Sequence, residues 1–229
     1  MKKLLFYFTK GELILWFSSL FLITFSFIIF DREGYLTLIA SLIGATSLIF
    51  CAKGNPIGPF LMIIFGILYG IISFSFRYYG EMITYVGMTV PMSIFSFVAW
   101  IRNPYKGNVS EVTVSRLKRK DITFMLILTL AVTVVFYFIL KAFDTANLIP
   151  STVSVATSFL AVLLTYKRSP YYALVYAAND VVLIVLWILA AMTDISYLSV
   201  IICFIAFMAN DIYGFINWQK MQKKQNEGR

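Results

Sequence analysis

The amino-acid sequence predicts an all-α integral membrane protein with eight transmembrane helices. Hydrophobic residues make up 60% of the 229 residues and charged residues only 13%, whereas a soluble domain carries about 25% charged residues. The apolar residues gather in eight runs, each close to the roughly 20 residues that a helix needs to cross a bilayer. The runs are Leu13–Phe30, Leu36–Ala52, Ile57–Phe76, Met82–Ile101, Ile122–Leu140, Ile149–Tyr166, Tyr171–Ala191 and Ile195–Trp218.

Charged or turn-forming segments separate these runs. The first run follows three lysines, a pattern shared with signal peptides, but it ends in Asp31-Arg32-Glu33 without a small-residue cleavage pattern. We therefore expect a retained first helix. Lys53-Gly54-Asn55-Pro56 ends the second run, a long basic loop covers residues 102–121, and Lys167-Arg168-Ser169-Pro170 ends the sixth run.

Positive charge predicts the orientation. With the N-terminus in the cytoplasm, sixteen of the nineteen Lys and Arg residues fall in inside segments, and only Arg32, Arg77 and Lys141 fall outside. Short cytoplasmic loops carry this excess in membrane proteins. The bias alternates loop by loop, so we expect eight spans with both termini in the cytoplasm of a bacterial cell. We interpret the net charge of +8 as a topology signal rather than a nucleic-acid site.

A weak internal repeat joins spans two to four with spans six to eight. Residues 96–100, which end in Trp100, align with residues 214–218, which end in Trp218, and the loop 53–56 aligns with 167–170. The fifth span carries the chain back, so the two triplets run parallel, an arrangement that places a substrate site between the halves. The expected division of this single transporter domain is 1–34 (extra first helix), 36–101 (first repeat), 102–146 (basic loop and linker helix), 147–218 (second repeat) and 219–229 (cytoplasmic tail).

Three short motifs occur in order within this topology. They are Arg77-Tyr78-Tyr79-Gly80-Glu81, then Tyr176 to Asp180 followed by Trp187, and finally Asn210-Asp211-Ile212-Tyr213-Gly214 leading to Trp218. They resemble the basic-x-Tyr-Gly-acidic turn, the polar penultimate helix and the closing Tyr-Gly-aromatic-x-x-Trp signature of the PnuC-type vitamin transporters. That family shares its three-plus-one-plus-three plan with the SWEET sugar transporters. The likeness covers about residues 36–220.

The resemblance implies uptake of nicotinamide riboside, or of thiamine, riboflavin or deoxynucleosides as in relatives. It also implies facilitated diffusion, trapping of the product by a cytoplasmic kinase, and a homotrimer. Two departures concern the substrate. Ile83-Thr84-Tyr85 stands where the family has a glutamine, and Ser96-Phe97 replaces the Gly-Trp of the first repeat.

Polar and aromatic residues share one helical face in each of the last two spans. Residues three and four apart lie on the same face of a helix. The stripes are Tyr172, Tyr176, Asn179, Leu183 and Trp187 in span seven, and Cys203, Phe207, Asn210, Gly214 and Asn217 in span eight. From these stripes and their neighbours we predict a substrate site made by Asn179, Asp180, Tyr176, Trp187, Asn210, Asp211, Trp100 and Trp218.

The predicted chemistry follows from the residue types. A tryptophan or tyrosine ring can stack on an aromatic cation, asparagine can pair with a carboxamide or sugar hydroxyls, and an aspartate at membrane depth marks a ligand path more often than not. Structural alternatives stay open. The asparagines can form interhelical hydrogen bonds, Asp211 can be solvated at the helix end, and the tryptophans can be interface anchors.

Other classes of function are less consistent with the sequence. An enzyme needs converging nucleophile, base or metal groups, and this chain has no histidine and two isolated cysteines, Cys51 and Cys203. We therefore expect no catalytic residues, metal or cofactor. A proton-coupled carrier and a non-transporting scaffold or sensor remain alternatives.

Overall fold

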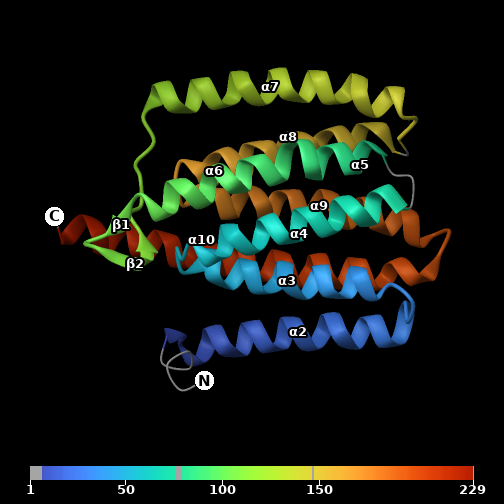
Figure 1. Cartoon of the computed structure of the whole chain (residues 1–229), viewed down its shortest axis with the longest axis horizontal. Coiled ribbons are helices and arrows are strands. Elements are labelled where there is room, and N and C mark those ends of the chain that lie inside the picture. The colour runs from blue at the N-terminus through green and yellow to red at the C-terminus, as the bar shows by residue number, and fades with distance from the viewer. Residues whose placement is uncertain (1–6, 76–78, 146, 229) are drawn as a thin grey trace.

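The computed structural model describes residues 7–75, 79–145 and 147–228. Eight helices in this part of the chain are long and apolar enough to cross a membrane, as the sequence predicts, and they lie nearly parallel (Figure 1). The helical elements are α2 (Lys10–Phe30), α3 (Tyr35–Ala52), α4 (Ile57–Ser75), α5 (Tyr79–Thr84) with η1 (Tyr85–Thr89) and α6 (Val90–Ile101), α7 (Arg119–Ala142), α8 (Leu148–Tyr166), α9 (Tyr171–Ala191), η2 (Ile195–Tyr197) and α10 (Leu198–Glu227).

Six of these helices form a closed ring. Each packs against the next in the order α3, α4, α6, α8, α9 and α10, and α10 packs against α3. Helix α2 lies outside the ring against α3 and α10, and α7 lies outside it against α8. The ring therefore consists of two helix triplets that meet at two seams, α6 with α8 and α10 with α3.

The fourth span is not a uniform α-helix. A π-helical turn, η1, separates α5 from α6, and the N–H of Val90 bonds the carbonyl of Tyr85, five residues earlier. Pro91 follows directly and has no N–H to continue the ladder. Such π-helical turns often mark functional sites, and here the turn lies on the ring interior at the pocket described below.

The basic loop and the predicted tail are both ordered. Strands β1 (Pro104–Tyr105) and β2 (Asn108–Val112) pair antiparallel, a hairpin that the sequence analysis did not anticipate. Helix α10 continues through the predicted tail to Glu227, and its Gln225 side chain accepts from the N–H of Val114 at 2.8 Å. The hairpin and the end of α10 lie at one end of the bundle, which we call the hairpin end (Figure 1).

The loops that follow α3 and α8 have matching conformations. Gly54 and Arg168 both adopt a positive φ, of 66° and 56°. Their carbonyl oxygens accept from the backbone N–H groups of Val112 and Ser115, at 2.9 and 3.0 Å. The stretch from the end of β2 to Ser115 is therefore bonded to both triplets.

Candidate functional site

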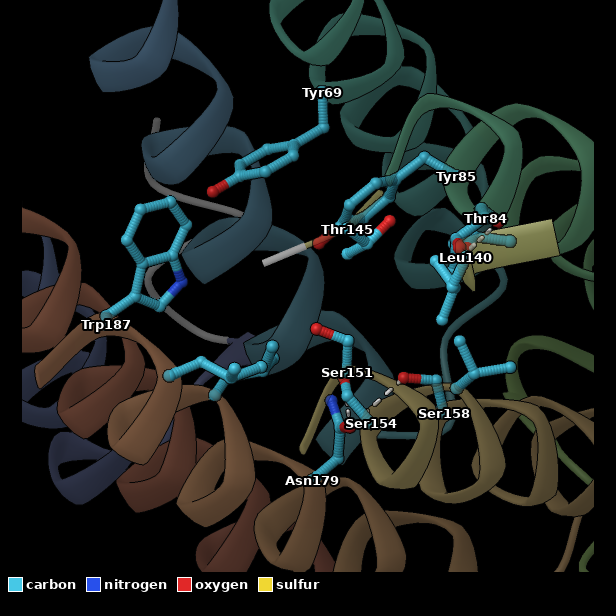
Figure 2. A pocket seen from close by; sticks show the side chains of 14 residues that line it. Tyr69, Thr84, Tyr85, Leu140, Thr145, Ser151, Ser154, Ser158, Asn179 and Trp187 are labelled. Carbon is cyan, nitrogen blue, oxygen red and sulfur yellow. Dashed lines mark hydrogen bonds between the residues drawn. The ribbon is translucent and has the colours of Figure 1, made fainter. Parts of the chain in front are cut away.

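A pocket lined by polar, aromatic and aliphatic side chains lies among the helices (Figure 2), in the half of the bundle away from the hairpin. We call it the distal pocket. Its volume is about 80 Å³, and α4, α5, η1, α7, α8, α9 and the segment after α7 all contribute to it. Its lining is Tyr69, Thr84, Tyr85, Thr89, Leu140, Thr145, Ser151, Ser154, Val155, Ser158, Asn179, Leu183, Leu186 and Trp187.

Asn179 is the polar centre of one wall. Its side-chain oxygen accepts hydrogen bonds from Ser154 at 3.1 Å, Thr157 at 2.7 Å and Ser158 at 3.2 Å. All three hydroxyl groups belong to α8, so the bonds tie α9 to α8. The amide nitrogen points toward the cavity (Figure 2). Asn179 therefore forms the interhelical bonds of the structural alternative and also presents a donor to the pocket.

Aromatic side chains form the facing walls. Tyr69 on α4 packs against Tyr85 on η1 with ring centroids 4.7 Å apart, and Trp187 on α9 faces Tyr69 in Figure 2. Gly66 and Gly70 bring α4 close to the fourth span, since a Cβ on either would lie within 2.8 Å of Val90 or Val86. Tyr69 is not among the site residues that the sequence predicts, and the structure places it in the pocket.

No charged residue is among the fourteen that line the distal pocket. An aromatic cation can still bind there, because the faces of tyrosine and tryptophan rings attract cations by about 0.5–2 kcal/mol each. Serine, threonine and asparagine supply donors and acceptors for hydroxyl groups and carboxamides. The pocket thus suits a flat, polyhydroxylated and weakly charged ligand.

Asp180 and Asp211 lie elsewhere. Both side chains are buried, each 4% exposed, and they interact with each other across the α9–α10 interface. Neither lines the distal pocket. The Oδ2 atom of Asp180 has no hydrogen-bond partner among the described residues. Neither carboxylate therefore faces the distal pocket in this structure.

Asn210 forms hydrogen bonds to α2 and within its own helix. Its amide nitrogen donates to the Ser19 hydroxyl on α2 and to the Ala206 carbonyl, both at 2.8 Å. It is 1% exposed and does not line the pocket. The amide nitrogen of Asn210 therefore makes the interhelical hydrogen bond that was its alternative role, while its side-chain oxygen has no partner among the described residues.

Trp100, Trp218 and Tyr176 lie toward the hairpin end. Both tryptophans are fully buried, with ring centroids 5.3 Å apart, so they are not anchors at the membrane interface. Tyr176 lines a second, smaller cavity rather than the distal pocket. Of the eight predicted site residues, the structure brings only Asn179 and Trp187 into the distal pocket.

The wall of hydroxyl-bearing side chains on α8 is not among the predicted site residues. Ser151, Ser154 and Ser158 follow the three- and four-residue spacing of a helix face, which could have revealed them. Thr84 and Tyr85 fall in the stretch that departs from the family's glutamine, so this departure lies at the pocket. The turn motif that begins at Arg77 falls partly outside the described residues, which exclude 76–78.

Comparison with known proteins identifies the family. Residues 34–220 match the model of the nicotinamide mononucleotide transporter family. The chain belongs to this family. It is similar to the nicotinamide riboside transporter PnuC of Neisseria mucosa, with 25% identity over 86% of this chain and 77% of that protein. It is also similar to PnuC of Haemophilus influenzae, with 23% identity over 85% and 83% of the two chains.

A solved structure supports the fold. The crystal structure of the vitamin B3 transporter PnuC superposes with a TM-score of 0.80 and 22% identity, covering 95% of this chain and 94% of that one. The prediction of a PnuC-type, all-helical membrane transporter is therefore confirmed. The relatives are named as transporters, in agreement with the expectation that the chain is not an enzyme.

Proposed function

We propose that this protein imports nicotinamide riboside across a bacterial cytoplasmic membrane, with the distal pocket as its binding site. The observation that carries the proposal is the composition of the pocket. Aromatic rings on α4, η1 and α9 surround a space beside the amide of Asn179. These rings suit the pyridinium ring, and the amide and hydroxyl groups suit the carboxamide and ribose.

The absence of charge in the lining favours the riboside over its phosphate. A phosphate group carries up to two negative charges and is bound in proteins mainly by Arg, Lys or helix N-termini. No Arg or Lys is among the residues that line the pocket. A phosphorylated product would therefore bind poorly, which supports trapping of the imported vitamin by cytoplasmic phosphorylation.

The charge distribution supports an orientation with both termini in the cytoplasm. Among the described residues, the hairpin end carries most of the cationic side chains, and the opposite end carries only Arg32 and Lys141. Short loops rich in Lys and Arg face the cytoplasm. The distal pocket then lies toward the outer surface, from which a vitamin enters.

Facilitated diffusion is the mechanism that we propose for this pocket. None of its lining side chains carries a charge that would couple a driving ion to the substrate. Its volume of about 80 Å³ is well below the roughly 300–1,000 Å³ of typical ligand pockets. The helix triplets must therefore separate to admit a nucleoside. Family resemblance supports a homotrimer as the assembly.

A ligand-stability experiment tests the substrate. The detergent-purified protein is heated with nicotinamide riboside, its mononucleotide, thiamine, riboflavin or a deoxynucleoside. A ligand that binds only the folded state stabilises it by about 2.7 kcal/mol at a hundredfold excess over its dissociation constant. We expect stabilisation by the riboside and not by the mononucleotide. Stabilisation by thiamine alone would show that thiamine is the substrate instead of nicotinamide riboside. No stabilisation by any ligand would favour the scaffold or sensor alternative.

Uptake into proteoliposomes tests the mechanism. Facilitated diffusion predicts that internal nicotinamide riboside reaches the external concentration and does not exceed it. An imposed proton gradient should not change this plateau. Accumulation that disappears when the gradient is collapsed would instead establish a proton-coupled carrier.

A further inference from the structure

A second cavity lies among the ring helices, nearer the hairpin end than the distal pocket. We call it the proximal cavity. Its volume is about 20 Å³. One face of α9 lines both spaces in series, with Tyr172 and Tyr176 at the proximal cavity and Asn179, Leu183 and Trp187 at the distal pocket. The remaining lining is Leu48, Cys51, Pro59, Met62, Ser93, Ser96, Val162 and Thr165.

One polar group in this lining has no partner. Ser96 is 1% exposed, and its hydroxyl oxygen makes no hydrogen bond with the described residues. An unsatisfied polar group is costly in a membrane interior, where water is not at hand to compensate it. Ser96 therefore leaves a hydrogen-bonding group available in the wall of this cavity.

Two tryptophans pack behind the lining of the proximal cavity, where they contact residues that line it. The ring centroids of Trp100 and Trp218 are 5.3 Å apart, and those of Trp218 and Tyr172 are 5.1 Å apart. The Trp100 indole N–H donates to the Thr165 carbonyl at 2.9 Å, and the Trp218 indole N–H donates to the Cys51 carbonyl at 2.8 Å. Each bond therefore crosses one of the two seams between the helix triplets.

The two bonds occupy corresponding places in the chain. Thr165 and Cys51 each stand two residues before the lysine that begins a matching loop, Lys167 or Lys53. Thr165 and Cys51 also line the cavity themselves. Separation of the triplets at this end must break both indole hydrogen bonds, and it would open the proximal cavity at the same time.

We propose that the proximal cavity is a second substrate subsite, which receives the hydroxyl-bearing ribose end of the nucleoside. Trp100 and Trp218 form the cytoplasmic gate of this subsite. This inference rests on the proposed function for the identity of the substrate and for the direction of the cytoplasm. The Ser96 hydroxyl binds a ribose hydroxyl as the substrate passes from the distal pocket, and the gate opens when the two indole bonds break.

Native cysteines offer a test of the gate that does not use the substrate. Cys51 lines the proximal cavity and is a buried free thiol. With Cys203→Ala as background, its reaction with a membrane-impermeant methanethiosulfonate is timed in inside-out and right-side-out vesicles. Trp100→Phe and Trp218→Phe keep most of the ring and remove the N–H donor. We expect each to speed the reaction from the cytoplasmic side by about tenfold, as loss of one net hydrogen bond allows.

The matched control is Trp16→Phe. Trp16 also donates an interhelical hydrogen bond, to Thr46 at 3.2 Å, but it lies on α2 outside the ring. This variant should leave the Cys51 rate unchanged. Unchanged rates in both gate variants, or equal acceleration from the two sides of the membrane, would overturn the gate. A Cys51→Ala protein verifies that the label reports on Cys51.

The subsite is tested with Ser96→Ala. If Ser96 were only a packing residue, removing its unpaired hydroxyl would leave transport unchanged and the melting temperature equal or higher. The proposal predicts an equal or higher melting temperature together with nicotinamide riboside transport slowed about fivefold to tenfold, which corresponds to one lost hydrogen bond. Ser73→Ala is the control, because the Ser73 hydroxyl is also buried and unpartnered among the described residues but lines neither cavity.

The outcomes separate this inference from the proposed function. Equal transport by the Ser96 and Ser73 variants would overturn the subsite. If nicotinamide riboside neither stabilised nor crossed with the wild-type protein, the proposed substrate would fail. The Cys51 rates would then still decide the gate, because they are measured without substrate.

Discussion

Replacement of Asn179 by alanine should weaken substrate binding with little loss of stability. Asn179 accepts from three α8 hydroxyl groups. Thr157 already shares its hydroxyl with the Val153 and Ser154 carbonyls, at 2.9 and 3.1 Å. The serines can likewise turn back to carbonyls of their own helix. Each hydroxyl group then still has an acceptor. We therefore expect the free energy of unfolding to fall by about 1 kcal/mol or less.

The effect on binding is larger. The variant loses the donor that points into the distal pocket, and the α8 hydroxyl groups lose the acceptor that orients them toward it. Two substrate hydrogen bonds at about 0.5–1.5 kcal/mol each amount to roughly 1–3 kcal/mol. The dissociation constant for nicotinamide riboside should therefore rise by about 5- to 150-fold.

The assay compares Asn179→Ala with Asn210→Ala. Both asparagines are buried and form interhelical bonds, but Asn210 contacts Ser19 on α2 away from the pocket. Affinity comes from isothermal titration, and stability comes from thermal unfolding without ligand. We expect Asn210→Ala to lose about 1–2 kcal/mol of stability and to keep its affinity. Affinity of Asn179→Ala within twofold of the wild type would refute the assignment of the pocket.

Three further predictions follow from buried groups. Asp180→Asn should bind nicotinamide riboside as the wild type does and melt at a higher temperature, because it replaces one of two adjacent buried carboxyl groups with an uncharged amide that can donate to Asp211; a tenfold loss in titration would place Asp180 in the site. Glu12→Gln should lose about 1–3 kcal/mol in thermal unfolding, because Lys53 loses an ion-pair partner that is 2% exposed; an unchanged melting temperature would contradict this. Gly58→Ala should cost about 1–3 kcal/mol in the same assay, since its Cβ would lie 2.5 Å from the Cys51 sulfur, whereas a neutral result would show that α3 and α4 can separate freely.

The fold could be predicted because its determinants are local in the sequence. Hydropathy over about 20 residues identifies a span, and charge between spans predicts direction. Both signals can be read from the sequence without knowing which helices pack together. The hairpin after Ile101 was missed because its strands have two and five residues. The tail was missed because the stability of α10 beyond Trp218 includes contacts of Gln225 with Glu111, Val112 and Val114, more than 100 residues away.

The site could be predicted only in part, for a physical reason. A helical stripe shows which residues share a face, and the α9 stripe indeed lines two spaces in series. A stripe does not show which neighbour the face meets. Asn179 and Asn210 look equivalent in sequence, yet one faces the ring interior and the other faces α2. That difference depends on the packing of α2 against α10, which no local pattern encodes.

The N-termini of α2 and α7 make matching contacts, and this similarity concerns the predicted internal repeat. The backbone N–H of Thr9 bonds Glu12 at 2.6 Å, and that of Lys118 bonds Asp121 at 3.2 Å. The two carboxylates pair with Lys53 and Lys167, the residues that begin the matching loops, at 3.1 and 2.9 Å. The repeat remains a prediction, and these contacts support a version of it with four helices in each half, in which α2 is the counterpart of α7.

The two counterparts differ in how firmly they are held. The pair of Lys53 with Glu12 is buried, and the Tyr213 hydroxyl on α10 donates to the same carboxylate at 2.8 Å. The side chains of Lys167 and Asp121 are 36% and 30% exposed, and ion pairs open to solvent contribute little to stability. Helix α2 is thus bonded to α10 five residues before Trp218, and it packs against both α3 and α10, whereas the main packing partner of α7 in the described structure is α8. If the gate opens as we propose, the unequal support predicts that the α6–α8 seam moves more than the α10–α3 seam. Trp100→Phe should then accelerate Cys51 labelling more than Trp218→Phe, and the reverse order would contradict this assignment.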